Sequence, residues 1–128
     1  MVVFDLDGTL IKEEFLPLVG KLVGKEKEIA EITELGMQGV ISFKDSIERR
    51  LKILGKIDAT LIEKALKSCT ITNGAKELIQ ELKTRKYCTA VATGSIRPLA
   101  EFISDKLDID HFISNDVELS PIPVFKPP

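Results

Sequence analysis

The chain has 128 residues, enough for one domain with a real core or for a small core with an inserted segment. Its 18 basic and 20 acidic residues nearly cancel, so charge gives no reason to expect binding to nucleic acid or to an anionic membrane. Cys69 and Cys88 are far apart, no apolar run is long enough to span a membrane, and no basic region precedes the N-terminal apolar stretch. These features predict a cytoplasmic protein with reduced thiols.

The first predicted element is a short strand that leads directly into two aspartates. An apolar run over residues 2–4 is followed by Asp5 and Asp7, spaced i, i+2, and then by Gly8 and Thr9. Carboxylates this close repel, so both stay ionised only near a cation, or one keeps a proton. The pattern favours Mg²⁺, which prefers oxygen ligands and serves phosphate chemistry. The alternative is an ordinary strand-to-turn exit with two solvated aspartates.

The middle of the chain, about residues 15–66, is predicted to be helical, because apolar residues recur there at helical spacing and no alternating pattern occurs. Glycines at 36, 39 and 55 divide it into three or four helices. Ser42 is a candidate N-cap, with Asp45 placed at the positive end of the helix dipole, and Asp58 is a candidate cap for the next helix.

An alternation of helix and strand follows. Residues 75–85 form a predicted amphipathic helix with Leu78, Ile79 and Leu82 facing inward, and residues 87–93 form a β-rich run. A helix with Pro98 in its first turn and a short strand at residues 112–113 come next. This order favours a parallel sheet with crossover connections. Residues 121–128 contain four prolines and are predicted to be an extended tail outside the core.

The segment Asp5-Leu6-Asp7-Gly8-Thr9 resembles the first motif, DxDGT, of the haloacid dehalogenase superfamily of phosphatases. The resemblance implies that Asp5 is the nucleophile that becomes an aspartyl-phosphate and that Asp7 is the general acid and base. It also implies that both aspartates contribute to a Mg²⁺ site. Thr93-Gly94 resembles the second motif, a hydroxyl residue at a strand end, and would bind phosphate oxygens at a helix N-terminus. Without the first motif, Thr-Gly after a strand would be ordinary turn chemistry.

The fold class implied by this resemblance is α/β, with a Rossmannoid parallel sheet and a helical cap inserted after the first motif. We expect residues 1–12 and 69–128 to form the core, which would lack the C-terminal strands of the superfamily, and residues 13–68 to form the cap.

Within the superfamily the chain is similar to the phosphoserine phosphatases, from Val2 to about Asn115. The similarity implies four pocket residues: Glu14 at the substrate ammonium, Arg50 at its carboxylate, and Met37 and Phe43 in an apolar lid. Each has an ordinary alternative. Glu14 and Arg50 each adjoin a residue of the same type and could be solvated, while Met37 and Phe43 could pack in the cap core. The implied ligand is a small phosphorylated metabolite, phosphoserine, which suggests a place in serine biosynthesis.

Two expected parts of the superfamily's site are not found in the sequence. No Gly-Asp dipeptide of the fourth motif occurs, and Lys126, followed by two prolines, is a poor match to the third-motif lysine. We therefore expect Mg²⁺ to bind poorly and turnover by this chain alone to be limited. The apolar run at residues 2–4 would also form a sheet edge, which favours self-association or a longer protein. A phosphatase and a relative that binds phosphorylated ligands without turnover both stay open.

Overall fold

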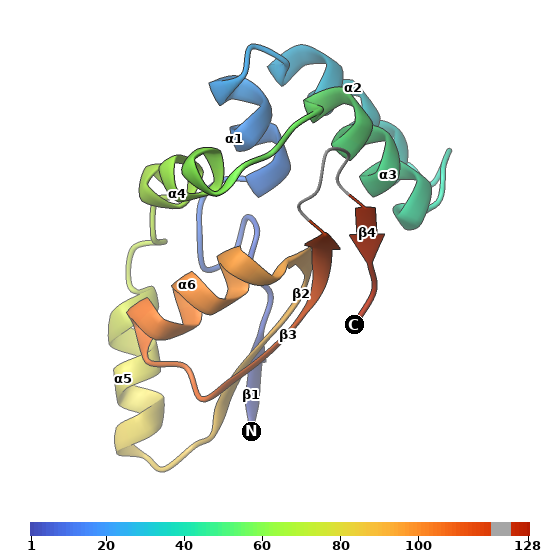
Figure 1. The fold of residues 1–128 in the computed structure, drawn as a ribbon. Helices are drawn as coiled ribbons and strands as arrows, with labels where there is room; N and C mark the ends of the chain where they lie inside the picture. Colours follow the sequence, from blue (N-terminus) through green and yellow to red (C-terminus); the bar gives the residue numbers. More distant parts are fainter. Residues whose placement is uncertain (119–123) are drawn as a thin grey trace. The chain divides into compact units, whose positions relative to one another are not determined.

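The computed structural model describes residues 1–118 and 124–128, and within them the chain divides into two compact units. The first unit comprises Met1–Glu14, Ser68–Asp116 and Pro127–Pro128, and the second comprises Phe15–Lys67 and Val117–Lys126. Along the chain the elements are β1 (Val2–Phe4), α1 (Phe15–Leu22), α2 (Glu26–Met37), α3 (Phe43–Leu54), α4 (Ala59–Ser68), α5 (Ala75–Thr84), β2 (Thr89–Ile96), α6 (Arg97–Leu107), β3 (His111–Glu118) and β4 (Val124–Lys126) (Figure 1).

The second unit is built from helices whose starts and ends agree with local chemistry. Ser42 accepts a hydrogen bond from the Asp45 N–H at 3.0 Å, and Asp58 accepts one from the Leu61 N–H at 2.8 Å, so both predicted N-caps are confirmed. Helices α2 and α3 approach closely at Gly36, where an added Cβ would lie 2.7 Å from the Ser46 Oγ. Only a glycine leaves room for this contact.

The first unit is a parallel sheet with helices, as predicted. β1 pairs with β2 in the register Val2 to Thr89, and β2 pairs with β3 in the register Val91 to Phe112, both parallel. Helices α5 and α6 contact β2. The sheet order is β1-β2-β3-β4, so β1 is an edge strand among the described residues, as expected.

The two faces of the sheet differ in burial. Val91 is 1% exposed, whereas Val3 and Ile113 are 57% and 56% exposed. Because side chains alternate along a strand, and Val3 and Ile113 stand opposite Ala90 and Ala92 of β2, these two exposed side chains share one face. The helices of the unit therefore cover the other face.

Three details differ from the sequence predictions. Leu78 is 49% exposed, so the inward face of α5 is carried instead by Ala75 and Ile79. β3 is eight residues long rather than a two-residue strand, because its polar C-terminal half continues the ladder. Residues 124–126 form β4, so the predicted tail is wrong there; residues 119–123 of that tail lie outside the described part of the chain.

No helix among the described residues is long and apolar enough to cross a membrane.

A cluster of charged residues lies at the end of the sheet where β2 begins. Asp110 accepts hydrogen bonds from the Thr89 N–H at 2.8 Å and the Thr89 hydroxyl at 3.0 Å. Lys83 lies 2.8 Å from Asp108 and 3.5 Å from Asp110. The hydrogen bond from the Thr89 backbone is the main reason that the pKa of Asp110 is lowered, and the bond to Asp108 raises the pKa of Lys83. Asp110 therefore joins the starts of β2 and β3.

We expect Asp110→Asn to lower the midpoint of thermal unfolding at neutral pH. A lowered native pKa stabilises the fold above the unfolded-state pKa, and that stability is lost as the pH falls through the native value. The difference between wild type and variant should therefore shrink below a pH of about 4. Circular dichroism melts from pH 2 to 8 measure it, with Asp105→Asn, an exposed carboxylate on α6, as the matched control. A difference that does not change with pH would contradict the assignment.

Candidate active site

The C-terminal ends of three parallel strands meet at one edge of the first unit. Asp5 follows β1 directly, Thr93-Gly94 lies in the last part of β2, and Asn115 lies in the second half of β3. The register, with Phe4 opposite Val91, brings the residues after Phe4 and Val91 to the same level of the sheet. The structure thus brings Asp5, Asp7, Thr93 and Gly94 to one edge, where α/β proteins bind ligands.

The loop after β1 folds around a single buried residue. Leu6 is 0% exposed, and its carbonyl accepts the N–H groups of three following residues at 3.0–3.2 Å, those of Thr9, Leu10 and Ile11. On either side of it, Asp5 is exposed and Asp7 is partly exposed. The Leu6 N–H donates to the Asp5 Oδ1 at 2.7 Å, which fixes the orientation of that carboxylate. The turn around Leu6 therefore leaves the Asp5 side chain exposed, whereas the Oδ1 atom of Asp7 is buried.

The rest of this loop is held by residues 70–72. The Lys12 N–H donates to the Thr70 carbonyl and the Thr72 N–H to the Leu10 carbonyl, each at 2.9 Å. Both carboxylate oxygens of Glu13 accept the Thr70 N–H, at 3.0 and 2.9 Å. Burial alone would raise the pKa of Glu13, but the hydrogen bonds from Thr70 outweigh it and the pKa is lowered. Glu13 thus has a structural role, because its carboxylate holds the backbone at Thr70.

Glu14 has a different environment from its neighbour. Gly8 adopts a φ of +70°, and a Cβ added there would lie 3.4 Å from the Glu14 Oε1. The Glu14 carboxylate therefore lies over the turn of the Asp5–Asp7 loop, within the same unit. The sequence could not distinguish these two adjacent acids, and the structure separates them by their contacts.

Thr93 and Gly94 lie where β2 changes register. The pairing between β2 and β3 shifts between Ala92 and Ile96, so residues 93–95 form an irregular segment of the strand. The Ser95 N–H donates to the Thr93 Oγ1 at 3.0 Å, and the Asn115 Nδ2 donates to the Gly94 carbonyl at 2.7 Å. Helix α6, with Pro98 in its first turn as predicted, begins immediately afterwards.

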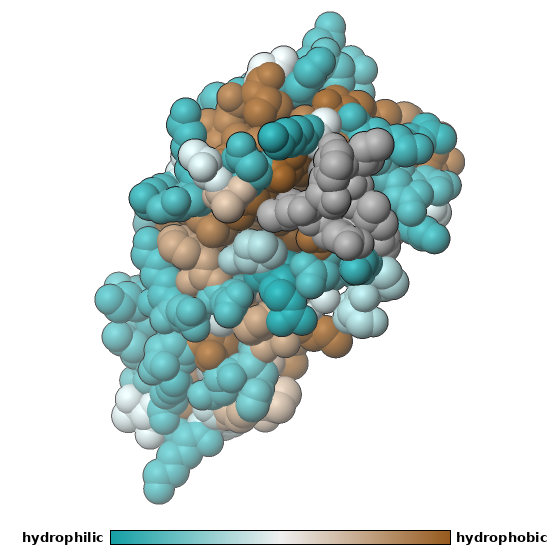
Figure 2. Space-filling model, in the orientation of Figure 1, coloured by the Kyte–Doolittle hydropathy of each residue, from teal (hydrophilic) through white to brown (hydrophobic). Residues whose placement is uncertain are grey.

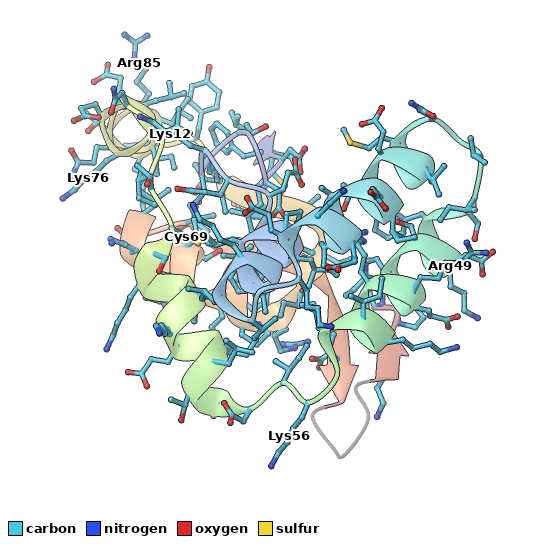
Figure 3. The ribbon with its side chains drawn as sticks, turned by 90° about the horizontal axis from the view of Figure 1, so that it is seen from above. Lys12, Arg49, Lys56, Cys69, Lys76 and Arg85 are labelled. Carbon is cyan, nitrogen blue, oxygen red and sulfur yellow. The ribbon has the colours of Figure 1, made fainter. Side chains whose placement is uncertain are left out.

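The remaining predicted residues lie in the helical unit. Arg50 on α3 is 8% exposed, and it donates from Nε to the Ser46 carbonyl at 3.2 Å and from Nη1 to the Thr33 hydroxyl at 3.3 Å. Arg49 is exposed, and its side chain extends outward from α3 (Figure 3). Arg50 is therefore not the solvated surface arginine that was its alternative, whereas Arg49 is.

Met37 and Phe43 are exposed rather than packed in the helical core. Their exposed fractions are 73% and 54%, and that of Val40 between them in sequence is 65%. Hydrophobic residues also gather at the surface over the helices of this unit in Figure 2. The alternative that these two residues are core residues is wrong for this structure.

Two acidic residues late in the chain take part in structure. Asp108 caps α6 in a left-handed conformation, and Asp116 lies 3.5 Å from Arg97. Among the described residues no group of three or more His, Cys, Asp or Glu side chains has the arrangement of a metal site. Near the first-motif loop, burial raises the pKa of the Cys69 thiol to about 12, and Glu13 and Asp7 add to this effect. This thiol is protonated at neutral pH and is a poor nucleophile.

Comparison with known proteins assigns the family. A family model described as haloacid dehalogenase-like hydrolase matches residues 1–128, the whole chain. The chain belongs to the haloacid dehalogenase-like hydrolases. The resemblance drawn from Asp5-Leu6-Asp7-Gly8-Thr9 is confirmed, and so is the α/β fold with an inserted helical cap.

Relatives within this hydrolase family carry the name phosphoserine phosphatase. The chain is 38% identical over 120 residues to a probable phosphoserine phosphatase of Schizosaccharomyces pombe, covering 94% of this chain and 40% of the relative. It is 35% identical over 115 residues to a phosphoserine phosphatase of Methanocaldococcus jannaschii, covering 90% of this chain and 54% of the relative. The chain thus spans about half the length of the curated relatives it matches.

Solved structures give the same result. A phospho-aspartyl intermediate analogue of phosphoserine phosphatase superposes with a TM-score of 0.90 at 31% identity, over 98% of this chain and 62% of the other. A substrate-bound phosphoserine phosphatase complex superposes with a TM-score of 0.87 at 31% identity, over 97% and 61%.

Sequence reasoning assigned no role to Asn115 or Glu13. From the sequence, Asn115 is only the end of the segment that is similar to the phosphoserine phosphatases, because an asparagine followed by an aspartate gives no sign of its partner across the sheet. Glu13 resembles Glu14 in sequence, and only the contact with Thr70, 57 residues away, identifies it as structural.

Proposed function

We propose that this hydrolase acts on phosphomonoesters as a Mg²⁺-dependent enzyme of phosphoserine phosphatase type. The observation that carries the proposal is the Asp5–Asp7 loop, which presents two carboxylates at the strand ends beside Thr93 and Gly94. Relatives named phosphoserine phosphatase that align with 90–94% of this chain support the substrate class.

The two aspartates divide the chemistry between them. A carboxylate oxygen of Asp5 attacks phosphorus while the bond to the ester oxygen breaks, and Asp7, initially protonated, gives its proton to that oxygen. Asp7 then takes a proton from water, which attacks phosphorus and releases phosphate with regeneration of the Asp5 carboxylate. The bond from the Leu6 N–H at 2.7 Å supports this assignment, because it orients Asp5 before the reaction.

The phosphate oxygens would be bound by donors from β2 and the start of α6. The Thr93 hydroxyl supplies one donor, and Gly94 allows a ligand to approach the backbone closely. The N-terminus of an 11-residue helix directly after this segment favours an anion through its dipole and its open N–H groups.

The donor set of the loop fits a Mg²⁺ ion as the protein's share of a site. Asp5 would offer a carboxylate oxygen and Asp7 its backbone carbonyl oxygen, and Mg²⁺ is commonly bound by one or two carboxylates, several waters and a substrate phosphate. Bound there, the ion would neutralise charge on the phosphate oxygens.

Four further residues would select the substrate in this proposal. Glu14, over the Gly8 turn, would meet the ammonium group of phosphoserine, and Arg50 its carboxylate. The exposed apolar side chains of Met37 and Phe43 would exclude water. In this proposal residues 13–68 form the cap, and residues 1–12 and 69–128 form the core. The cytoplasmic compartment and serine biosynthesis stay predictions from the sequence.

Phosphate release tests the proposal directly. With Mg²⁺ and either phosphoserine or p-nitrophenyl phosphate, we expect release of phosphate that falls on the order of 10³-fold or more in Asp5→Asn, which keeps the shape but removes the nucleophile. Beryllium fluoride binding detected by ¹⁹F NMR would show whether Asp5 can form a phosphate-like adduct. No release at any Mg²⁺ concentration, with binding retained, would favour the alternative of ligand binding without turnover.

Arg50 and Arg49 provide a matched pair for the substrate assignment. Arg50→Ala should raise the KM for phosphoserine about tenfold to a hundredfold, the range for loss of a charge-assisted hydrogen bond, and leave the KM for p-nitrophenyl phosphate nearly unchanged, since that ester has no carboxylate. Arg49→Ala should change neither. Equal losses with both esters would mean that Arg50 only supports the contact between α2 and α3.

We also propose self-association through β1. The Val2 N–H donates to Cys88, so the Val3 N–H and carbonyl point to the open edge of the sheet. Light scattering should give a mass above 14.2 kDa that falls to the monomer value in Val3→Pro, because proline removes the edge donor. Val3→Thr keeps the donor and should stay associated. A wild-type chain that is monomeric at all concentrations contradicts the proposal.

A further inference from the structure

The irregular part of β2 is held by a buried side chain from the neighbouring strand. Asn115 on β3 is 6% exposed, and its side-chain amide lies 2.7 Å from the Gly94 carbonyl. A carbonyl oxygen can only accept, so the group that faces it is the Nδ2 donor. Asn115 thus fixes the direction of the Gly94 carbonyl.

The opposite side of the same peptide plane is also held. Every peptide bond between described residues is trans, so the Gly94 carbonyl and the Ser95 N–H point in opposite directions. The Ser95 N–H donates to the Thr93 Oγ1 at 3.0 Å. One rigid peptide therefore connects the Asn115 side chain to the Thr93 hydroxyl.

This connection decides what the Thr93 hydroxyl can do. A threonine hydroxyl has one proton and two lone pairs, and the Ser95 N–H occupies a lone pair. The proton then points away from Ser95 and is available to an acceptor. If the peptide plane were rotated by about half a turn, the Gly94 carbonyl would face Thr93 and accept a hydrogen bond from its hydroxyl. The partial negative charge of the carbonyl oxygen would then lie beside any bound anion.

We propose that Asn115 is a positioning residue that holds the Gly94–Ser95 peptide so that Thr93 donates to a phosphate group. The inference rests on the proposed phosphate-binding role of Thr93 and adds a residue that acts through it, without touching the ligand. Asn115 is suited to this role because it is buried and belongs to the strand next to β2.

A double-mutant cycle tests the connection with inorganic phosphate as the probe. The dissociation constant is measured by isothermal titration in Mg²⁺ for wild type, Asn115→Ala, Thr93→Val and the double variant. Each single change should weaken binding about tenfold, and the double variant should be no weaker than Thr93→Val alone. If the loss of affinity in the double variant equalled the product of the two single losses, the proposal would be overturned, because Asn115 would then act independently of Thr93.

Two further variants separate positioning from a general loss of stability. Asn115→Asp keeps the shape but places an acceptor against the Gly94 carbonyl, so it should weaken phosphate binding at least as much as alanine. Ser104→Ala removes another buried polar side chain, on α6, and should leave the constant unchanged. An Asn115→Asp variant that is folded and binds phosphate as wild type would overturn the proposal.

Hydrogen exchange of the Ser95 amide gives a readout that needs no ligand. We expect slow exchange in wild type and faster exchange in both Asn115→Ala and Thr93→Val. If wild type does not bind phosphate, the proposed function fails, while this measurement still tests the orientation of the peptide. A Ser95 amide that stays protected in Asn115→Ala overturns the inference whatever the binding result.

Discussion

The burial of Leu6 is the constraint on which the candidate site depends. After a strand that ends in two aspartates, the chain could continue the alternation of the strand or form a mobile turn. Here the Leu6 side chain is fully buried, and three N–H groups converge on its carbonyl, so the chain must turn around this residue. The residues on either side, the exposed Asp5 and the partly exposed Asp7, are consequently held in one turn. The buried Leu6 side chain thus sets the backbone geometry of Asp5 and Asp7, the two residues that would act on the substrate.

The same division between support and chemistry recurs at each part of the site. Glu13 binds the Thr70 backbone while the adjacent Glu14 lies over the Gly8 turn, and Arg49 is solvated while Arg50 bonds to Thr33 and Ser46. In each pair, two adjacent residues of the same type have different environments. The sequence pattern can identify such pairs, but only tertiary contacts show which residue of the pair is structural and which is a candidate for function.

Elements determined by nearby residues were predictable from the sequence, and elements determined by distant ones were not. The caps at Ser42 and Asp58 depend on residues three positions away, and the first motif on five consecutive residues. By contrast, the exposure of Leu78 depends on which side of α5 meets the sheet. The strand at residues 124–126 depends on its neighbour in the sheet, β3. The role of Asn115 required the register shift of β2, which no periodicity predicts.

Electrostatics connects the loop to its proposed ligand. Asp5, Asp7 and Glu14 belong to one ten-residue stretch that folds on itself, so its edge of the sheet carries concentrated negative charge. Such a surface repels a phosphate dianion unless positive charge accompanies it. In the proposed function, a divalent cation held by Asp5 and Asp7, a proton on the Asp7 carboxyl group and an ammonium group near Glu14 would together remove this repulsion. Under the proposed function, a phosphorylated amine would therefore suit this edge better than a simple phosphate ester, because only the amine brings part of the compensating charge with it.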